Sequence, residues 1–296
     1  MSPLLAIARA EGRLHLRRPS FWLLLLLFTG LLIAAGALNR HRQVRDRAQQ
    51  ESLQQLVRAQ WEGQPDRHPH RVAHYGTFAF KPPGPLAAFD PGLDSYAGRS
   101  LYLEAHRQNA ANFAEAGELS SAFRLGELSP AFVLQLLLPL VVVVLGHRVW
   151  VDEAESGRLR LLLGLGVPPR RLVAGKALGL VLALLPFAVL AVVVCTWTLA
   201  GDPALTATSS AAARVALIAG ALALHTAAWV GLTVWVSCRT GSAARACAVL
   251  VSLWITGSVI LPRTVAGFAA AHPPLPDKSS FTAAVAEEVR QHGDSH

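Results

Sequence analysis

The sequence predicts an all-α, polytopic membrane protein, and three observations support this fold class. First, 52% of the 296 residues are hydrophobic and only 16% are charged, whereas soluble domains carry about 25% charged residues. Second, five apolar stretches reach the length of roughly 20 residues that a helix needs to cross the hydrocarbon core of a bilayer. Third, arginine and lysine gather in alternate connections between these stretches, as the positive-inside rule predicts.

The apolar stretches define the predicted membrane spans. They cover residues 20–38, 130–149, 177–200, 213–236 and 244–261. The second and third contain Pro139 and Pro186, which packed membrane helices tolerate and which often mark a kink. The first apolar run is longer than the h-region of a signal peptide, and no convincing A-x-A-like cleavage site follows it. We therefore expect it to be retained as a span.

The basic residues predict the orientation of the chain. Four arginines precede the first span, at positions 9, 13, 17 and 18, and the connection between spans two and three holds six basic residues (Arg148, Arg158, Arg160, Arg170, Arg171 and Lys176). The connection at residues 201–210 holds none. This alternation predicts a cytoplasmic N-terminus. It also accounts for the net charge of +8 without a nucleic-acid partner.

Residues 1–19 predict an amphipathic helix that lies in the membrane interface. Three arginines spaced four residues apart would point toward lipid headgroups. The opposite face carries Leu4, Leu5, Ala8 and Leu14, interrupted by Glu11 and His15. The alternative is that this segment is only the charged flank of the first span.

The segments after spans one and five are predicted to be extracytoplasmic. Residues 39–129 would form an α-rich domain, with a helix continuing to Trp61, a loop rich in proline and glycine at residues 63–98, and helical character at residues 100–116. Residues 262–296 would begin a second outer region, with a helix from about Ser279 to Gln291. The three cysteines lie in or beside spans, so no disulfide framework is expected.

Two groups of histidines are candidate functional sites. His68, His70 and His74 lie within seven residues of the outer segment and could ligate zinc or copper, although their spacing matches no standard zinc frame; hydrogen-bonded loop histidines are the alternative. His225 is the one central ionisable residue within the spans. It could serve an intramembrane enzyme or simply donate a hydrogen bond to a neighbouring helix.

The sequence lacks the common motifs of nucleotide binding and hydrolysis. The stretch most similar to a P-loop is Gly175-Lys176-Ala177. It lacks the earlier glycine and the hydroxyl that binds Mg²⁺ in a P-loop. Neither G-x-S-x-G nor H-E-x-x-H occurs. We therefore expect no cofactor on this chain and a transport role rather than an enzymatic one.

The connection at residues 150–176 contains DEAESGRLRLLLGLGVPPRRLVAGK and predicts a hairpin of two short helices. Acidic residues open the first helix, where they favour the positive end of the helix dipole, and leucines supply an apolar face. Glycine and proline at positions 164–169 break it, and Arg170 and Arg171 begin the second. A short amphipathic helix outside the lipid needs a surface to bury against, such as a groove on another protein.

These residues resemble the membrane subunit of a bacterial type-2 ABC exporter. In that family an acidic E-x-E-x-G-T-L-like run and a following P-x-x-R-x-x-x-x-G-K form the cytoplasmic element that docks on the ATPase. The matching positions here are Glu153, Glu155, Gly157 and Leu159, followed by Arg170 or Arg171, Gly175 and Lys176. The resemblance implies that the acidic and basic residues make polar contacts with the ATPase and that Leu159 and Leu162 fill its groove. Arg158 stands where threonine is common. The outer runs PHRVAHYGTFAFKP, FDPGLDSYAG and LEAHRQN resemble a branch of these permeases with a large extracytoplasmic domain.

The resemblance implies a function and a set of partners. It implies a permease of the bacterial inner membrane that works as a homodimer or with a similar subunit, and a separate ATPase subunit that binds ATP and Mg²⁺. Members have six spans, so the sixth would be missing from this sequence. The substrate and its direction are not indicated. The alternatives that remain are an extracytoplasmic metal-handling protein and an intramembrane enzyme using His225.

Overall fold

The structure is a computed structural model that describes residues 3–92, 94, 98–105, 111–112, 128–200, 202, 205, 210–271 and 278–292. The chain divides into two compact units, Met1–Cys247 and Ala248–His296.

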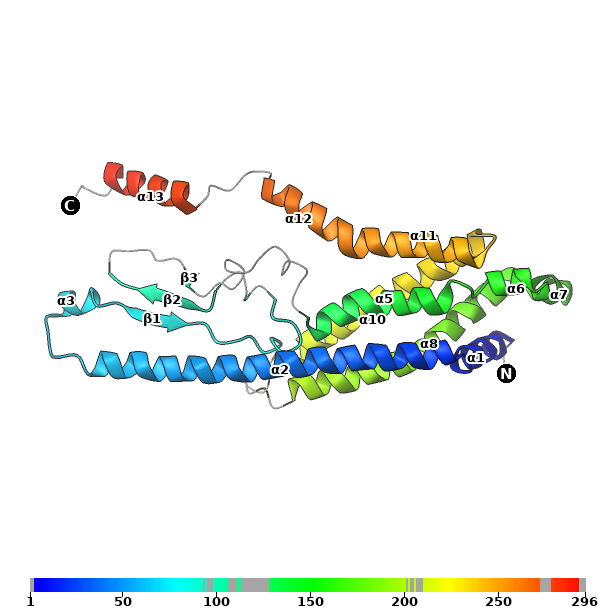
Figure 1. Cartoon of the computed structure of the whole chain (residues 1–296), viewed down its shortest axis with the longest axis horizontal. Helices are drawn as coiled ribbons and strands as arrows, with labels where there is room; N and C mark the ends of the chain where they lie inside the picture. Colours follow the sequence, from blue (N-terminus) through cyan, green and yellow to red (C-terminus); the bar gives the residue numbers. More distant parts are fainter. Residues whose placement is uncertain are drawn as a thin grey trace. The chain divides into compact units, whose positions relative to one another are not determined.

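Long apolar helices dominate the first unit (Figure 1). The long ones are α2 (Pro19–Glu62), α5 (Pro130–Gly146), α8 (Pro169–Leu199) and α10 (Ala211–Arg239). Shorter helices are α1 (Pro3–Leu16), α3 (Pro69–Ala73), α6 (Val151–Glu155) and α7 (Arg158–Gly164). Helix α11 (Ala243–Ile255) begins in this unit and crosses into the second.

The core of the first unit forms where α2, α5, α8 and α10 pack together. The Phe187 ring of α8 makes edge contacts with Phe21 and Phe28 of α2, at centroid distances of 5.6 and 5.5 Å. Small residues bring the backbones close, as is common between membrane helices. A Cβ at Gly146 of α5 would lie 2.6 Å from the Thr233 side chain of α10.

The second unit continues from α11 through a π-helical turn (Thr256–Ile260) into α12 (Leu261–Ala271). A further helix, α13, spans Lys278–His292, close to the predicted range. With this unit included, five helices are long and apolar enough to cross a membrane: Pro19–Glu62, Pro130–Glu155, Pro169–Leu199, Ala211–Arg239 and Ala243–Val265. The all-α polytopic fold and the five predicted spans are therefore confirmed.

The segment after α2 differs from the prediction of an α-rich domain. Helical character at residues 100–116 is wrong where the structure describes that range. Residues Ser100–Leu103 form strand β2 and Ala111–Asn112 form β3, while residues 106–110 and 113–116 lie outside the described residues. Strand β1 (Thr77–Phe80) pairs antiparallel with β2, with Thr77 opposite Leu103 and Phe80 opposite Ser100, and β2 pairs with β3.

Cross-strand contacts explain why residues 100–103 are extended. The Tyr102 ring lies 4.9 Å from that of Phe78, and the Tyr102 hydroxyl donates a hydrogen bond of 2.9 Å to the Tyr75 carbonyl. Such pairs outweigh the weak helical preference of a short segment. The sheet lies beside the far half of α2, which packs against β1 (Figure 1).

A second difference concerns the start of span three. The sequence predicts a separate short helix at Arg170 and Arg171, but both residues lie in the first turn of α8, which runs unbroken to Leu199. Proline at the first position of a helix is favourable because its missing N–H would be unpaired there anyway. Pro169 therefore starts the long helix instead of ending a short one.

Candidate functional site

The predicted hairpin exists and joins α5 to α8. Helix α6 ends at Glu155, Gly157 turns the chain with a φ of +76°, and α7 begins at Arg158. A side chain at this φ would be strained, so the turn favours glycine. The hairpin lies at the same end of the unit as α1 (Figure 1), which we call the hairpin end. The opposite end of α8, at Leu199, is the distal end.

A buried lysine, Lys176, joins three elements at the hairpin end. The Lys176 Nζ donates to Glu11 Oε2 of α1 at 2.7 Å and to Glu153 Oε1 of α6 at 2.9 Å. Only 3% of the Lys176 side chain is exposed. Glu153 also accepts a bond of 2.8 Å from Arg158 Nε of α7. The four residues link α1, α6, α7 and α8 by charge-assisted hydrogen bonds, which are stronger than neutral ones.

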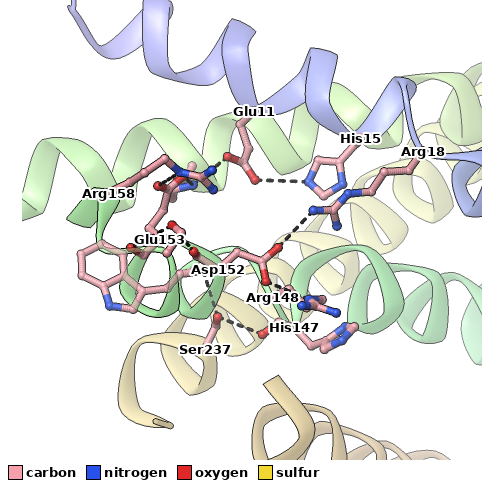
Figure 2. Close-up of polar contacts among 12 residues, drawn as sticks. Glu11, His15, Arg18, His147, Arg148, Asp152, Glu153, Arg158 and Ser237 are labelled. Atoms are coloured by element: carbon pink, nitrogen blue, oxygen red, sulfur yellow. Dashed lines mark hydrogen bonds and ion pairs between the residues drawn. The ribbon is translucent and has the colours of Figure 1, made fainter. Parts of the chain in front are cut away.

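A second carboxylate ties α6 to the start of α2. Asp152 Oδ1 accepts from Arg148 Nε at 2.8 Å, and its Oδ2 accepts from Arg18 Nη2 at 3.1 Å. Ser237 of α10 fixes the end of α5 from the other side (Figure 2): its hydroxyl accepts from the Trp150 amide at 3.1 Å and donates to the His147 carbonyl at 3.0 Å. The base of the hairpin is thus anchored to α2 and α10 as well as to α1 and α8.

Helix α1 packs directly against α8. A Cβ at Gly175 would lie 2.7 Å from the Ile7 side chain, and one at Gly179 would lie 2.5 Å from Glu11 Cβ and 2.9 Å from the Ala8 carbonyl oxygen. The two glycines form a G-x-x-x-G pair, the pattern that lets membrane helices approach closely. On α1, the residues buried by this contact include Glu11 and His15, which the sequence pattern placed as interruptions of an apolar face.

His15 is held neutral at this contact. It is 1% exposed, and neither ring nitrogen has a hydrogen-bond partner among the described residues. Burial is the main cause that lowers the pKa of His15 from 6.5 to about 4; the positive charges of Arg18 and Lys176 lower it as well, while Asp152 acts in the opposite direction. Glu11 Oε1 lies 3.6 Å from His15 Nε2.

The hairpin surface that faces away from the helices is apolar at its tip. Leu161, Leu163 and Leu165 are 65%, 40% and 72% exposed, while Leu159 and Leu162 are half-buried. Burying a leucine side chain contributes about 1.5–3 kcal/mol. Leucines left in this position on a short helix form a surface suited to contact with another protein.

The nine residues predicted to couple to an ATPase occupy different environments. Glu153, Gly175 and Lys176 face inward and contact other parts of the chain. Glu155, Arg170 and Arg171 are exposed, and none of them forms an ion pair with another residue that the structure describes. Gly157 supplies the turn, and the two leucines lie on the half-buried side of α7.

Sequence reasoning missed three residues of this site. In the sequence, Glu11 interrupts the apolar face of the first helix, Gly179 lies within the predicted third span, and Ser237 directly follows the predicted fourth span. The spacing of Gly175 and Gly179 is a sequence signal that could have indicated a close helix contact. No comparable signal pointed to Glu11 or Ser237.

The other candidate sites are the outer histidines and His225. His70 and His74 approach to 3.4 Å between their Nε2 atoms, and His68 Nδ1 accepts a bond from the His70 amide. Among the residues that the structure describes, no three His, Cys, Asp or Glu side chains gather as a metal site. His225 lies 6.4 Å from the Trp229 ring, and its Nε2 is buried without a hydrogen-bond partner in the described part of the chain.

Comparison with known proteins assigns the chain to a family. The family described as ABC-2 family transporter protein matches residues 5–280, nearly the whole chain. No curated protein and no solved structure matches. The match includes most of α1, the hairpin and the five apolar helices. The chain therefore belongs to the ABC-2 family of transporter proteins and is a membrane-spanning permease subunit of an ABC transporter.

Proposed function

We propose that the α6–α7 hairpin is the cytoplasmic docking element for a separate ATPase subunit, and that it passes motion of the ATPase to the membrane helices. The ATPase would bind ATP and Mg²⁺, and two permease subunits would together form the transport path. Three features support this proposal: the exposed leucines at the hairpin tip, the exposed charges at its base, and the ion pairs that hold the hairpin to α1 and α8.

The observation that carries the proposal is the position of Lys176. Its ammonium group bonds to both Glu11 and Glu153 while nearly fully buried. A push on α6 would therefore displace Lys176 and α8 together with α1, because separating the charges would leave a buried ion unpaired. Breaking a buried ion pair on one side costs about 3–5 kcal/mol, which favours movement of the three elements as one body.

The exposed charges would set the orientation of the partner. Glu155 lies at the end of α6, while Arg170 and Arg171 lie in the first turn of α8. Charges at the rim of an interface mainly affect association rate and specificity. The leucines would contribute most of the affinity, since burial of apolar surface dominates association between proteins.

The test is co-purification of this chain with the ATPase subunit. The variant carries aspartate at the two most exposed tip leucines, Leu161→Asp with Leu165→Asp. We expect loss of the complex and of transport, with membrane insertion unchanged, because two carboxylates would be desolvated without partners. Leu162→Asp, on the half-buried side of α7, should have the same outcome.

The matched control is Leu56→Asp. Leu56 is 55% exposed on the part of α2 beyond the predicted span, so the control places an aspartate at an exposed leucine away from the hairpin, as Leu162→Asp places a single aspartate within it. The control should retain the ATPase. If the tip variant also retains it at the wild-type yield, the hairpin is not the docking element.

A further inference from the structure

A long apolar groove opens between α8 and α10. It has a volume of about 420 Å³ and is closed at its sides by Leu134 and Leu138 of α5 and by Leu86 and Phe89. The volume falls in the range of about 300–1,000 Å³ that is usual for ligand sites. Along α8 the lining runs from Val181 to Leu199, a rise of about 27 Å. That length approaches the roughly 30 Å of a bilayer hydrocarbon core.

The groove offers almost nothing to a polar cargo. Among the residues that the structure describes, no charged residue lines it, and the hydroxyl groups of Thr196 and Thr226 already donate within their own helices. Thr196 Oγ1 bonds to the Val192 carbonyl at 2.8 Å, and Thr226 Oγ1 bonds to the Leu222 carbonyl at 2.8 Å. A sugar, a charged peptide or a metal chelate would lose its hydration in this groove without replacement, which is unfavourable for each polar group.

Arginines gather at the distal end of the groove. The Arg40 guanidinium donates a 2.6 Å bond to the Trp197 carbonyl and lies 5.6 Å from the centre of the Trp197 ring. Arg47 pairs with Asp202 at 2.5 Å. Trp197 lies between the lining residues Thr196 and Leu199 of α8, so Arg40 lies beside the last turn of the groove.

A polar pocket adjoins the same end. It has a volume of about 250 Å³, and its lining includes Arg42, Arg45 and Arg99. The turn at residues 83–91 borders both spaces: Leu86 and Phe89 line the groove, whereas Pro83, Ala87 and Pro91 line the polar pocket. The acidic residues of the polar pocket already form ion pairs: Asp46 pairs with Arg99, and Asp94 pairs with Lys81. Arg45 is exposed.

We propose that the substrate is a membrane amphiphile with a phosphate headgroup, its acyl chain in the groove and its phosphate at the arginines of the distal end. This inference rests on the proposed permease function and names its substrate class. The apolar groove matches the acyl chain of such a lipid, and the arginines at its distal end match the charge of the headgroup. Arginine suits the phosphate because its planar fork binds phosphate oxygens in pairs.

The test measures which lipids stay with the purified chain. The protein is placed in bilayer discs of equal phosphatidylglycerol and phosphatidylcholine, and lipids retained after transfer to detergent are identified by native mass spectrometry. We expect retained phosphatidylglycerol. Each arginine near a membrane surface contributes about 1 kcal/mol toward an anionic lipid, so Arg45→Gln should lower the preference about fivefold.

Ala223→Trp tests the groove itself. Ala223 lines the groove, whereas the next residue, Leu224, is 73% exposed and does not line it. Ala223→Trp should abolish retention of the lipid, and Leu224→Trp should not. Equal retention of both lipids by the wild type, or retention of phosphatidylglycerol by Ala223→Trp, would overturn the proposal. A wild-type chain that forms a lipid-free dimer through this face would also overturn it, since the groove would then hold a helix of a second copy.

These results are independent of the docking experiment. Lipid retention is measured on this chain alone, without the ATPase. Retained phosphatidylglycerol with failed co-purification would leave the lipid site standing and remove the docking proposal. Successful co-purification without any lipid preference would leave the docking proposal standing and remove the lipid site.

Discussion

Replacing Lys176 with methionine removes the charge that links α1 to the hairpin while keeping much of the apolar stem. The Lys176 side chain is 3% exposed, and its ammonium group bonds to Glu11 and Glu153. Breaking a buried ion pair from one side costs about 3–5 kcal/mol. Glu153 keeps Arg158 at 2.8 Å, so only the Glu11 carboxylate loses its main partner. We therefore expect the free energy that docks α1 on α8 to fall by an amount near the lower end of this range, about 3 kcal/mol.

The loss should appear as release of α1 from α8. Helix α1 carries Arg9 and Arg13 on its exposed side, and trypsin should cut there when the helix detaches. Because 1.4 kcal/mol corresponds to a tenfold change in equilibrium, 3 kcal/mol should raise the detached fraction, and the cleavage rate, roughly 100-fold. The measurement is the rate of cleavage in detergent micelles, followed by mass spectrometry.

Two comparisons make this experiment decisive. Lys81→Met removes a lysine whose ion pair with Asp94, 2.6 Å long, is 54% exposed on the lysine side; such exposed pairs contribute about 0–1 kcal/mol. The second comparison is the double variant with Glu11→Gln, which should be less destabilised than the sum of the single variants, by roughly 1–3 kcal/mol. If Lys176→Met behaves like Lys81→Met, or if the effects of the single variants add, the buried lysine does not hold α1 to α8.

Two further outcomes are expected at the same contact. Gly179→Leu should detach α1 and reduce the free energy of docking by about 1–3 kcal/mol, since even a Cβ there would lie 2.5 Å from the Glu11 side chain. The control is Gly220→Leu, in open space, which should leave tryptic cleavage unchanged. Equal effects of the two variants would contradict the close packing of α1 on α8. Docking of α1 should also weaken in acid: His15 has a pKa of about 4 when docked and 6.5 when free, so the detached state binds more protons below pH 6.5. The loss should grow by about 1.4 kcal/mol for each pH unit between 6.5 and 4, reach about 1.4 kcal/mol at pH 5.5, and be absent in His15→Gln.

The membrane spans were predictable because their signal is local. A run of about 20 apolar residues in a lipid environment must form a helix, since no water satisfies its backbone groups. The hairpin was predictable for a similar reason, because Gly157 and the glycines and prolines at positions 164–169 interrupt the helical pattern. These features depend only on neighbouring residues.

The burial of α1 was not predictable in this way. Glu11 and His15 look unsuited to a buried face, and only the distant Lys176, 165 positions later in the chain, compensates the carboxylate. The strand at Ser100–Leu103 was missed for the same reason. Its conformation depends on Phe78 and Tyr75, more than twenty positions earlier, and a short segment carries too little local preference to reveal that pairing.

Helix α2 connects the predicted first span to the sheet region that contains β1. It continues without a break to Glu62, 24 residues past the predicted end of the first span, or about 36 Å. Its far half packs against β1 and is tied to the strand region by the ion pair between Asp46 and Arg99. If the helix tilts as a rigid body by about 5° at the bilayer, its far end moves by about 3 Å. The position of the sheet therefore changes with the tilt of the first span.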